Sequence, residues 1–485
     1  MYRSEALKKT RSTLFAACLL SLGVAAAVLP SVSQAAAAKF TSEQLQERML
    51  ERRAVEAALW GMPLVNFDAM RQAYFRDAGA QYNDIMYWSG PSDWKNQTTT
   101  PNHSTIYAMF FSNLKDGPVV FDIPATSKAS LYGAPLDAWT APLINVGTLG
   151  EDQGKGAKYL LLPPGYKGEV PAGYVPVQSS TYNVYALLRV ITKTVEKADL
   201  ADGVDYLKGI KVYPLADAAA PKAGRYVDIA GKVYDGIAKF DSSFYESLAR
   251  MVAEETLQDR DLTMMGQLRS LDIGKDLQFK PDAQRKALLE RAIGEAHAYM
   301  MEGYDKTGKT VWAGKRQWRT LAPMDIAVPT KLTFVEQGKG LNVDERSYAW
   351  FGMFGPIVPP GPHFYLKAYE TGNGEKLDGS KNYRLTIPAN VPAKEFWSVD
   401  VYDVNTGGFI REAKVVGLDS YNKAMKQNAD GTTDLYFGPK PPAGKESNWI
   451  STKAGEKFFT LFRIYGPDRD KLKAGWLLND IEQIK

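Results

Sequence analysis

Polar side chains of several chemical types crowd into one short segment of this sequence. Residues 102–107 read Asn-His-Ser-Thr-Ile-Tyr and lie between a polar loop and an apolar run. The imidazole of His103 is suited to general acid or base chemistry near neutral pH. Each polar group would cost roughly 1–3 kcal/mol if buried without a partner, whereas water or a ligand would satisfy it. We therefore predict a functional cleft here; a loop histidine bonded only to backbone groups is the alternative.

Groups from neighbouring segments complete the candidate site. We predict His103, Asp137 and Tyr107 as catalytic residues and Asn102, Trp139 and Arg189 as binding residues. In this arrangement Asn102 and Tyr107 donate to a polar substrate atom, and Trp139 stacks on the substrate. Arg189 anchors an anionic group or holds Asp137, because a buried guanidinium needs a partner. A buried Arg189–Asp137 pair that only orders the fold is the competing interpretation.

A second candidate binding set lies near the C-terminus and consists of Asn448, Trp449 and Arg463. Arg463 would share a strand face with Leu461 and Tyr465, where Asn448 and Trp449 could bond and stack. An architectural role for this set is the favoured interpretation. The remaining histidines, His297 beside a helical apolar stripe and His363 after a proline-rich turn, are also predicted to be structural.

Other reaction classes find little support in the motifs. No zinc or EF-hand motif and no histidine pair at ligand spacing occurs, so we predict no metal and no cofactor. A calcium ion held by loop oxygens is left open. Neither a GxSxG elbow nor an SxxK motif is present. A triad of Ser104, His103 and Asp137 is disfavoured because adjacent side chains of a strand diverge.

The predicted elements are mostly strands. Apolar and aromatic runs at 119–123, 131–143, 158–162 and 182–191, and again at 364–369, 383–387, 396–402, 435–437 and 458–465, are separated by turn residues. In the run 396–402 the alternation predicts a half-buried strand. Residues 41–60 predict a helix, capped by Thr41 or Ser42 and stopped by Gly61 and Pro63, with loops over 66–102.

Helical spacing of apolar residues returns over 243–257, 259–271 and 282–304. We therefore predict a mainly β protein with helical insertions (α+β), in which two β-sandwich or jelly-roll-like domains are joined by a helical module. The expected boundaries are 1–35 for a signal peptide, 36–200 for an N-terminal β-rich domain with a leading helix, 201–345 for the helical module and 346–485 for a C-terminal β-sandwich.

The N-terminus predicts export. A basic start, an apolar run and small residues at Ser33 and Ala35 are typical of a cleaved signal peptide. The only cysteine, Cys18, would leave with it, so the mature chain would contain no thiol. Removing four basic residues and one acid lowers the formal charge from +4 to +1, which gives no electrostatic case for nucleic acid. We expect a periplasmic or secreted protein without a membrane anchor, with a homo-oligomer left open.

The landmarks resemble a bacterial family with paired domains of unknown function, numbered twelve-fifty-four (N-terminal) and twelve-fourteen (C-terminal). The N-terminal likeness rests on residues 60–64, 100–107, 116–120, 137–140 and Arg189, and the C-terminal likeness on 396–398, 402–403, 436–439, 448–449 and 463–467. The resemblance implies two β-rich domains and frequent export, but no general activity. Many relatives carry Asp where this chain has Ser104, so a role of that Asp would be absent here or taken by His103.

From the residues we predict an exported enzyme, with hydrolysis of a small or oligomeric polar substrate as the favoured reaction. A non-catalytic periplasmic binding or envelope protein with aromatic ligand grooves is the alternative. Convergence of Asn102, His103, Tyr107, Asp137 and Arg189 on one open cavity would favour the enzyme, whereas a cluster sealed in the core would favour an architectural role.

N-terminal sequencing of exported material tests the predicted cleavage. We expect the mature chain to begin at or within a few residues of Ala36, because Ser33 and Ala35 fit the small-residue positions that signal peptidase needs. A membrane-bound product that keeps residues 1–35 would contradict this.

Overall fold

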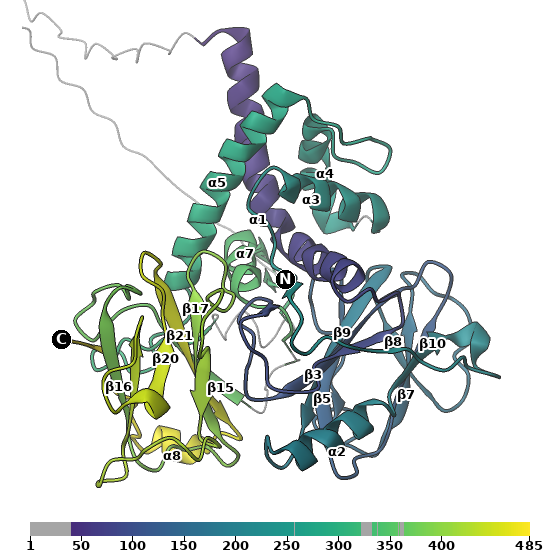
Figure 1. Cartoon of the computed structure of the whole chain (residues 1–485). Helices are drawn as coiled ribbons and strands as arrows, with labels where there is room; N and C mark the ends of the chain where they lie inside the picture. Colours follow the sequence, from purple (N-terminus) through teal and green to yellow (C-terminus); the bar gives the residue numbers. More distant parts are fainter. Residues whose placement is uncertain (1–39, 257, 322–331, 337, 357, 359–362) are drawn as a thin grey trace, which may run out of the picture. The chain divides into compact units, whose positions relative to one another are not determined.

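The computed structural model describes residues 40–256, 258–321, 332–336, 338–356, 358 and 363–485 (Figure 1). The predicted signal peptide lies outside these residues. The described chain is mostly β, with seven α-helices and several open sheets, as the sequence predicted. Its residues fall into two units, of which the first contributes the described residues 40–45 and the second comprises 46–485. In the first, the Thr41 hydroxyl accepts the Gln44 amide at 3.2 Å, and the Gln44 side chain accepts the Thr41 amide at 3.0 Å, which confirms Thr41 as the helix cap.

The N-terminal half of the longer unit is a β-sandwich. Its first sheet has the order β11-β1-β3-β9-β5-β6 and its second the order β10-β4-β7-β8. The strand bounds are β1 Ile85–Tyr87, β3 Ile106–Asn113, β4 Val119–Ile123, β5 Ser130–Asp137, β6 Val146–Gly147, β7 Ala157–Leu162, β8 Tyr174–Gln178, β9 Asn183–Ile191, β10 Lys211–Pro214 and β11 Tyr226–Asp228. Aliphatic and aromatic residues of both sheets, such as Phe110, Phe121 and Leu188, form the core between them.

The C-terminal half is a second sandwich, made of a sheet with the order β15-β21-β17-β18 and another with the order β20-β19-β16-β22. Its strands are β15 His363–Ala368, β16 Asn382–Ile387, β17 Trp397–Asp403, β18 Gly417–Asp419, β19 Thr433–Gly438, β20 Trp449–Ser451, β21 Phe458–Tyr465 and β22 Glu482–Ile484. Leu385, Val399, Phe437 and Phe462 pack in the core between the two sheets. The strands predicted in this half are all present.

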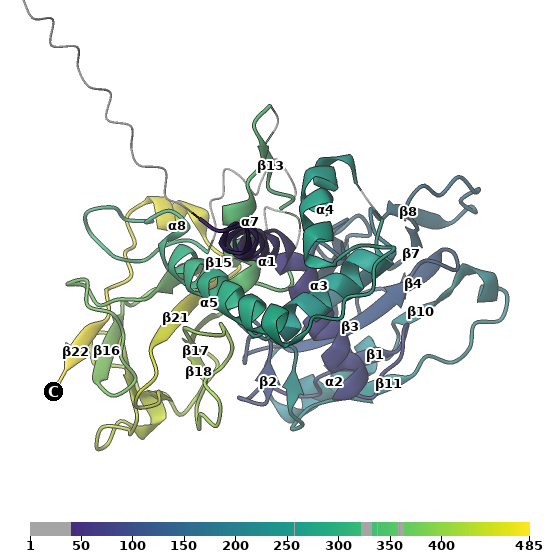
Figure 2. The same cartoon turned by 90° about the horizontal axis from the view of Figure 1, so that it is seen from above.

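A helical layer covers the outer faces of one sheet from each sandwich. One continuous core joins helix residues such as Phe67, Ile293 and Phe351 to Phe111 of β3 and Phe459 of β21. The helices of this layer are α1 Ser42–Arg76, α3 Ser243–Glu254, α4 Leu262–Leu268, α5 Ala283–Lys306 and α7 Val343–Gly352. Helix α2 Lys197–Leu207 packs instead on the core of the N-terminal sandwich, and α8 Arg469–Lys473 packs on that of the C-terminal sandwich. Figure 2 shows α3, α5 and α7 together, with strands of the two sandwiches on either side. The predicted helical module therefore lies between the β domains.

The sequence predicted that helix α1 would stop at Gly61 and Pro63. The helix instead continues to Arg76, with Pro63 inside it. Residues 57–68 are all buried, so packing outweighs the hydrogen bond that proline removes. Gly61 serves close approach instead of termination, because a Cβ there would lie 2.6 Å from Leu248 Cδ1. The loops expected from residue 66 begin only after Arg76.

Three short strands follow residue 210 and belong with the N-terminal strands. β10 pairs with β4, β11 with β1, and β12 (Tyr234–Asp235) with β2 (Asn96–Gln97). These strands lie within the segment 201–345 that the sequence predicted as a helical module, and the long helices of that segment begin at Ser243. Among the described residues, none of the helices combines the length and the apolar character needed to span a membrane.

Replacing Gly61 by Val should lower the free energy of unfolding by roughly 1–3 kcal/mol, because the added methyl groups meet buried Leu248. Chemical denaturation measures the effect. Gly294→Val in α5 is the matched control, since a Cβ there has nothing within 4 Å, and should stay within about 0.5 kcal/mol of wild type. Equal effects of the two substitutions would contradict the packing role of Gly61.

Candidate functional site

The polar segment 100–104 lies against the C-terminal sandwich. The Tyr402 hydroxyl donates to the Pro101 carbonyl at 2.6 Å, and Arg463 Nη2 donates to the carbonyls of Thr100 and Pro101 at 2.9 and 3.2 Å. The Asn102 side chain accepts the Ser104 amide at 2.7 Å and donates to the Tyr465 hydroxyl. The predicted cleft residues therefore meet strands of the second domain, a pairing across more than 300 residues of sequence.

His103 lies between two carboxylates of the C-terminal sandwich. Its Nδ1 is 2.5 Å from Asp400 Oδ1, and its Nε2 is 3.3 Å from both Asp419 Oδ2 and the Ser104 hydroxyl. Burial alone would lower the pKa of His103, but Asp400 and then Asp419 outweigh it and raise the pKa to about 9. The ring is therefore an imidazolium at neutral pH, which can donate a proton but cannot act as the general base.

The sequence predicted a half-buried strand, but β17 is buried on both faces. The neighbourhood of Asp400 explains the difference. Asp400 has no exposed surface and also pairs with Arg463 on the adjacent strand β21. Although burial opposes ionisation, His103 and Arg463 together lower the pKa of Asp400 below its ordinary value. Gly417 of β18 leaves room for this contact, because a Cβ there would lie 2.6 Å from both Asp400 Oδ1 and His103 Nδ1.

Arg189 lies in a cage of tyrosines from both sandwiches. On neighbouring strands it stands opposite Tyr107 and Tyr132, whose ring centroids are 5.1 and 5.4 Å from its guanidinium carbon. Tyr465 approaches to 5.0 Å, and the Tyr365 hydroxyl accepts a hydrogen bond from Nη2 at 3.2 Å. Among the described residues, buried Nε and Nη1 of Arg189 have no hydrogen-bond partner.

His363 lies at the same face and is electrostatically opposite to His103. It stands across from Tyr465 in the β15–β21 register and stacks on Tyr365 at 4.3 Å between ring centroids. Burial and then Arg189 and Arg463 hold the pKa of His363 well below its ordinary value, so its imidazole is neutral. Its buried Nδ1 has no hydrogen-bond partner within the described part of the chain.

Asp137 and Trp139 do not join this site. The predicted pair of Asp137 and Arg189 is wrong. The strand register places Asp137 opposite Val184, at the other end of β9 from Arg189. Its carboxylate accepts the amides of Trp139 and Ala141 and the Ser180 hydroxyl, at 3.0, 3.1 and 2.7 Å. Trp139 packs on Trp60 of α1 and provides no wall near His103.

The C-terminal set also separates. Arg463 belongs to the site. Asn448 and Trp449 lie at the other sheet, so the predicted bonding and stacking of these two residues beside Arg463 is wrong. The Asn448 side chain holds the backbone of Lys426 and Asp434, and the Trp449 indole donates to the Gly438 carbonyl at 2.9 Å. His297 stacks on Phe240 at 3.9 Å between ring centroids and bonds the Asn405 carbonyl.

The site therefore combines predicted residues with groups that sequence reasoning missed. The structure brings together five predicted residues, Asn102, His103, Tyr107, Arg189 and Arg463. It adds residues that were not predicted as site residues: Ser104, Tyr132, His363, Tyr365, Asp400, Asp419 and Tyr465. The polar alternation of β17 and β21 was the available signal for Asp400 and Arg463. Asp419 and Tyr365 carry no such signal in the sequence. No group of three or more metal-binding side chains occurs among the described residues.

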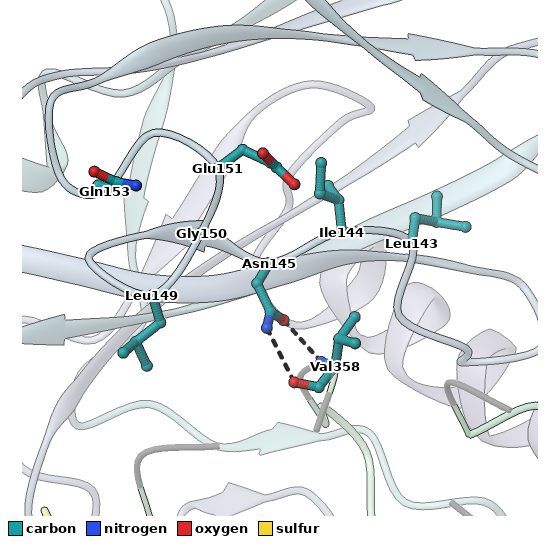
Figure 3. A pocket seen from close by; sticks show the side chains of 8 residues that line it. All are labelled: Leu143, Ile144, Asn145, Leu149, Gly150, Glu151, Gln153 and Val358. Carbon is teal, nitrogen blue, oxygen red and sulfur yellow. Dashed lines mark hydrogen bonds between the residues drawn. The ribbon is translucent and has the colours of Figure 1, made fainter. Parts of the chain in front are cut away.

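A separate pocket of about 310 Å³ lies in the N-terminal half (Figure 3). Leu143, Ile144, Leu149, Glu151 and Gln153 line it, together with Asn145, Gly150 and Val358. The Asn145 side chain donates to the Val358 carbonyl at 3.0 Å and accepts the Val358 backbone N–H at 2.7 Å. Because this side chain is already hydrogen-bonded and Glu151 is the only ionisable lining group, the pocket has fewer groups for acid, base or ligand binding than the cluster around His103.

Two family models match separate segments of the chain. Residues 82–214 match the family described as protein of unknown function (DUF1254), and residues 363–469 match that described as protein of unknown function (DUF1214). The chain carries both domains. The resemblance inferred from the sequence is thereby confirmed. Segment 100–107 and Arg189 lie in the DUF1254 domain, and Asp400, Asp419 and Arg463 lie in the DUF1214 domain.

Two solved structures are similar to the chain, and the first of them shows the same fold. The VPA0106 protein from Vibrio parahaemolyticus is 17% identical with a TM-score of 0.53, covering 90% of this chain and 100% of that chain. An uncharacterized protein from Burkholderia cenocepacia is 12% identical with a TM-score of 0.41, covering 91% and 95%. No curated protein matches the chain. The first likeness supports the fold alone.

The raised pKa of His103 predicts a pH dependence of stability. His103 stabilises the folded chain fully below pH 6.5, and this stabilisation is lost as the pH rises towards about 9, a difference of roughly 3 kcal/mol. The measurement is the free energy of unfolding of wild type minus that of His103→Gln, between pH 6 and 10. Burial lowers the pKa of Lys367 to about 7, so its contribution to the free energy of unfolding rises with pH, opposite to that of His103. Because Lys367 is present in both proteins, its contribution cancels in the difference. A difference that does not change with pH would refute the assignment.

Proposed function

We propose that the chain is an exported hydrolase that binds a small anionic substrate between its DUF1254 and DUF1214 domains. In this proposal Arg189 anchors the anionic group, His103 is the general acid and His363 is the general base. The protein would act in the periplasm or outside the cell, where its predicted signal peptide would direct it.

The observation that carries the proposal is the pair of histidines in one cluster. Asp400 and Asp419 keep His103 protonated, whereas burial beside Arg189 and Arg463 keeps His363 neutral. Environments that drive the pKa values of two like groups apart identify a proton donor and a proton acceptor. In this proposal Nδ1 of His363, which has no hydrogen-bond partner among the described residues, takes a proton from water, and His103 gives one to a leaving group.

The tyrosine cage supports an anionic substrate. A guanidinium desolvated by aromatic rings retains its full charge, and two buried nitrogens of Arg189, Nε and Nη1, lack a described acceptor. A carboxylate or phosphate would accept from these donors in the bidentate manner that arginine favours. The phenolic groups of Tyr132 and Tyr365 would lie beside the same anion.

A binding protein without catalysis is the second candidate. It is favoured by the contacts of both His103 nitrogens with carboxylates, because these bonds would have to loosen before the ring could act on a substrate. In that case Arg189 and the tyrosines alone would hold the ligand.

A substrate screen with matched variants separates the two candidates. Chromogenic phosphate monoesters and esters of dicarboxylic acids serve as substrates for wild type, His103→Gln, His363→Gln and Arg189→Met. We expect each histidine substitution to lower kcat by about 10²–10⁴-fold, and Arg189→Met to act mainly by raising KM. His297→Gln, which lies away from the cluster, should keep full activity.

Calorimetric titration with the corresponding free acids and with inorganic phosphate completes the test. Binding that is lost in Arg189→Met, without turnover of any ester, would establish the binding protein. If wild type neither binds nor hydrolyses these compounds, or if His103→Gln and His363→Gln remain fully active, the hydrolase proposal is wrong.

A further inference from the structure

A second cationic and aromatic cluster lies around Trp139, apart from His103. The turn 137–141 holds this side chain firmly, because the Asp137 carboxylate accepts two amides of the turn and its carbonyl accepts the Thr140 amide at 2.9 Å. Thr140 adopts a left-handed backbone with φ of 59°, so the turn is tightly specified. Trp139 is only 6% exposed and meets the edge of Trp60 at 5.0 Å between ring centroids.

Two guanidinium groups share the Trp139 ring. The Arg346 carbon lies 4.9 Å and the Arg260 carbon 5.4 Å from the ring centroid. Two like charges beside one buried ring repel each other. Burial followed by Arg260 lowers the pKa of Arg346, and the nearby carboxylates of Asp261 and Asp137 offset this only in part. Such an arrangement costs free energy unless negative charge compensates it.

The described acidic groups near these arginines are already engaged. Asp261 accepts the Trp60 indole N–H at 3.2 Å and lies 3.4 Å from Arg260, and Asp137 is used by its own turn and Ser180. Arg346 is 2% exposed and donates through Nη2 to the Trp60 carbonyl at 2.7 Å. No ion pair joins it to a carboxylate among the described residues.

Several buried donors of the cluster lack acceptors. Within the described chain, Arg346 Nε and Trp139 Nε1 have no hydrogen-bond partner, and neither has Nε1 of Trp350, one turn along α7. Buried donors without partners are rare in native proteins and call for a bound ion, water or ligand. The Arg260 side chain, 30% exposed, places one edge of the cluster at the surface.

We infer that the cluster of Trp139, Arg260 and Arg346 is a second ligand site, which binds a small oxyanion, either a carboxylate or a phosphate. The anion accepts hydrogen bonds from Arg346 Nε and from the Trp139 indole, and its charge separates the two guanidinium groups. This site is independent of the proposed hydrolysis, because its residues do not contact His103, Arg189 or His363 in the described structure.

The test is calorimetric titration of the full-length mature protein with inorganic phosphate and, separately, with acetate. Two binding events are expected in wild type: Arg189→Met should lose only the event at the first site, and the event at the Trp139 cluster should persist. It should weaken by about tenfold in Arg260→Gln and in Trp139→Phe, since each loses one charge or donor at the cluster. Arg250→Gln is the matched control and should bind as wild type, because Arg250 is a partly exposed arginine paired with Asp68.

Arg260→Gln is expected to fold, because the Arg260 side chain is partly exposed. Far-UV circular dichroism checks that each variant keeps the secondary structure of wild type. A crystal grown with phosphate should show an oxygen within hydrogen-bonding distance of Arg346 Nε. The inference is overturned if neither anion binds, or if binding disappears in Arg189→Met and is unchanged in Arg260→Gln and Trp139→Phe. A preference between phosphate and acetate would identify which oxyanion the site takes.

Discussion

The buried carboxylate of Asp400 is the interaction on which the junction of the two domains depends. It has no exposed surface and lies between Arg463 of its own sandwich and His103 of the other. An isolated carboxylate in such a place would cost several kcal/mol, so it must keep both partners. Arg463 in turn donates to the backbone of Thr100 and Pro101. The segment that carries His103 is therefore fixed by charge satisfaction and not by apolar packing.

This constraint explains the composition of the facing sheets. Along β21 the outward face changes from Phe459 and Leu461, which join the helical core, to Arg463 and Tyr465, which join the site. Along β9 the same face changes from Tyr185 to Arg189. Each sheet thus uses one end of its outer face for helix packing and the other for polar contact with its counterpart. The helices share one apolar core with both sheets, while the polar ends of the sheets meet through Asp400 and leave donors for a ligand.

The strands could be predicted from sequence because their alternation is local. What failed depended on contacts between distant segments. Gly61 and Pro63 carry the usual signals of a helix end, yet Leu248 and the burial around them keep α1 continuous. The Arg189–Asp137 pair was wrong because two residues on paired strands meet only when the register allows it. His103 and Asp400 are 297 positions apart, and no local pattern announces that contact.

The two clusters differ in what compensates their positive charge, and this difference separates their roles. Around His103, two carboxylates offset His103 and Arg463, whereas Arg189 in its tyrosine cage has no ion pair among the described residues and only the longer-range charge of Glu395 beside it. A cation without a directly paired carboxylate, beside proton donors and acceptors, is the arrangement that positions an anionic group for chemistry. Around Trp139, the carboxylates of Asp261 and Asp137 lie near the two guanidinium groups but are engaged in other hydrogen bonds, and no histidine lies among the described contacts. That cluster supplies charge and hydrogen-bond donors but no pair of histidines with opposite pKa shifts, so we expect it to hold an anion and not to transform it.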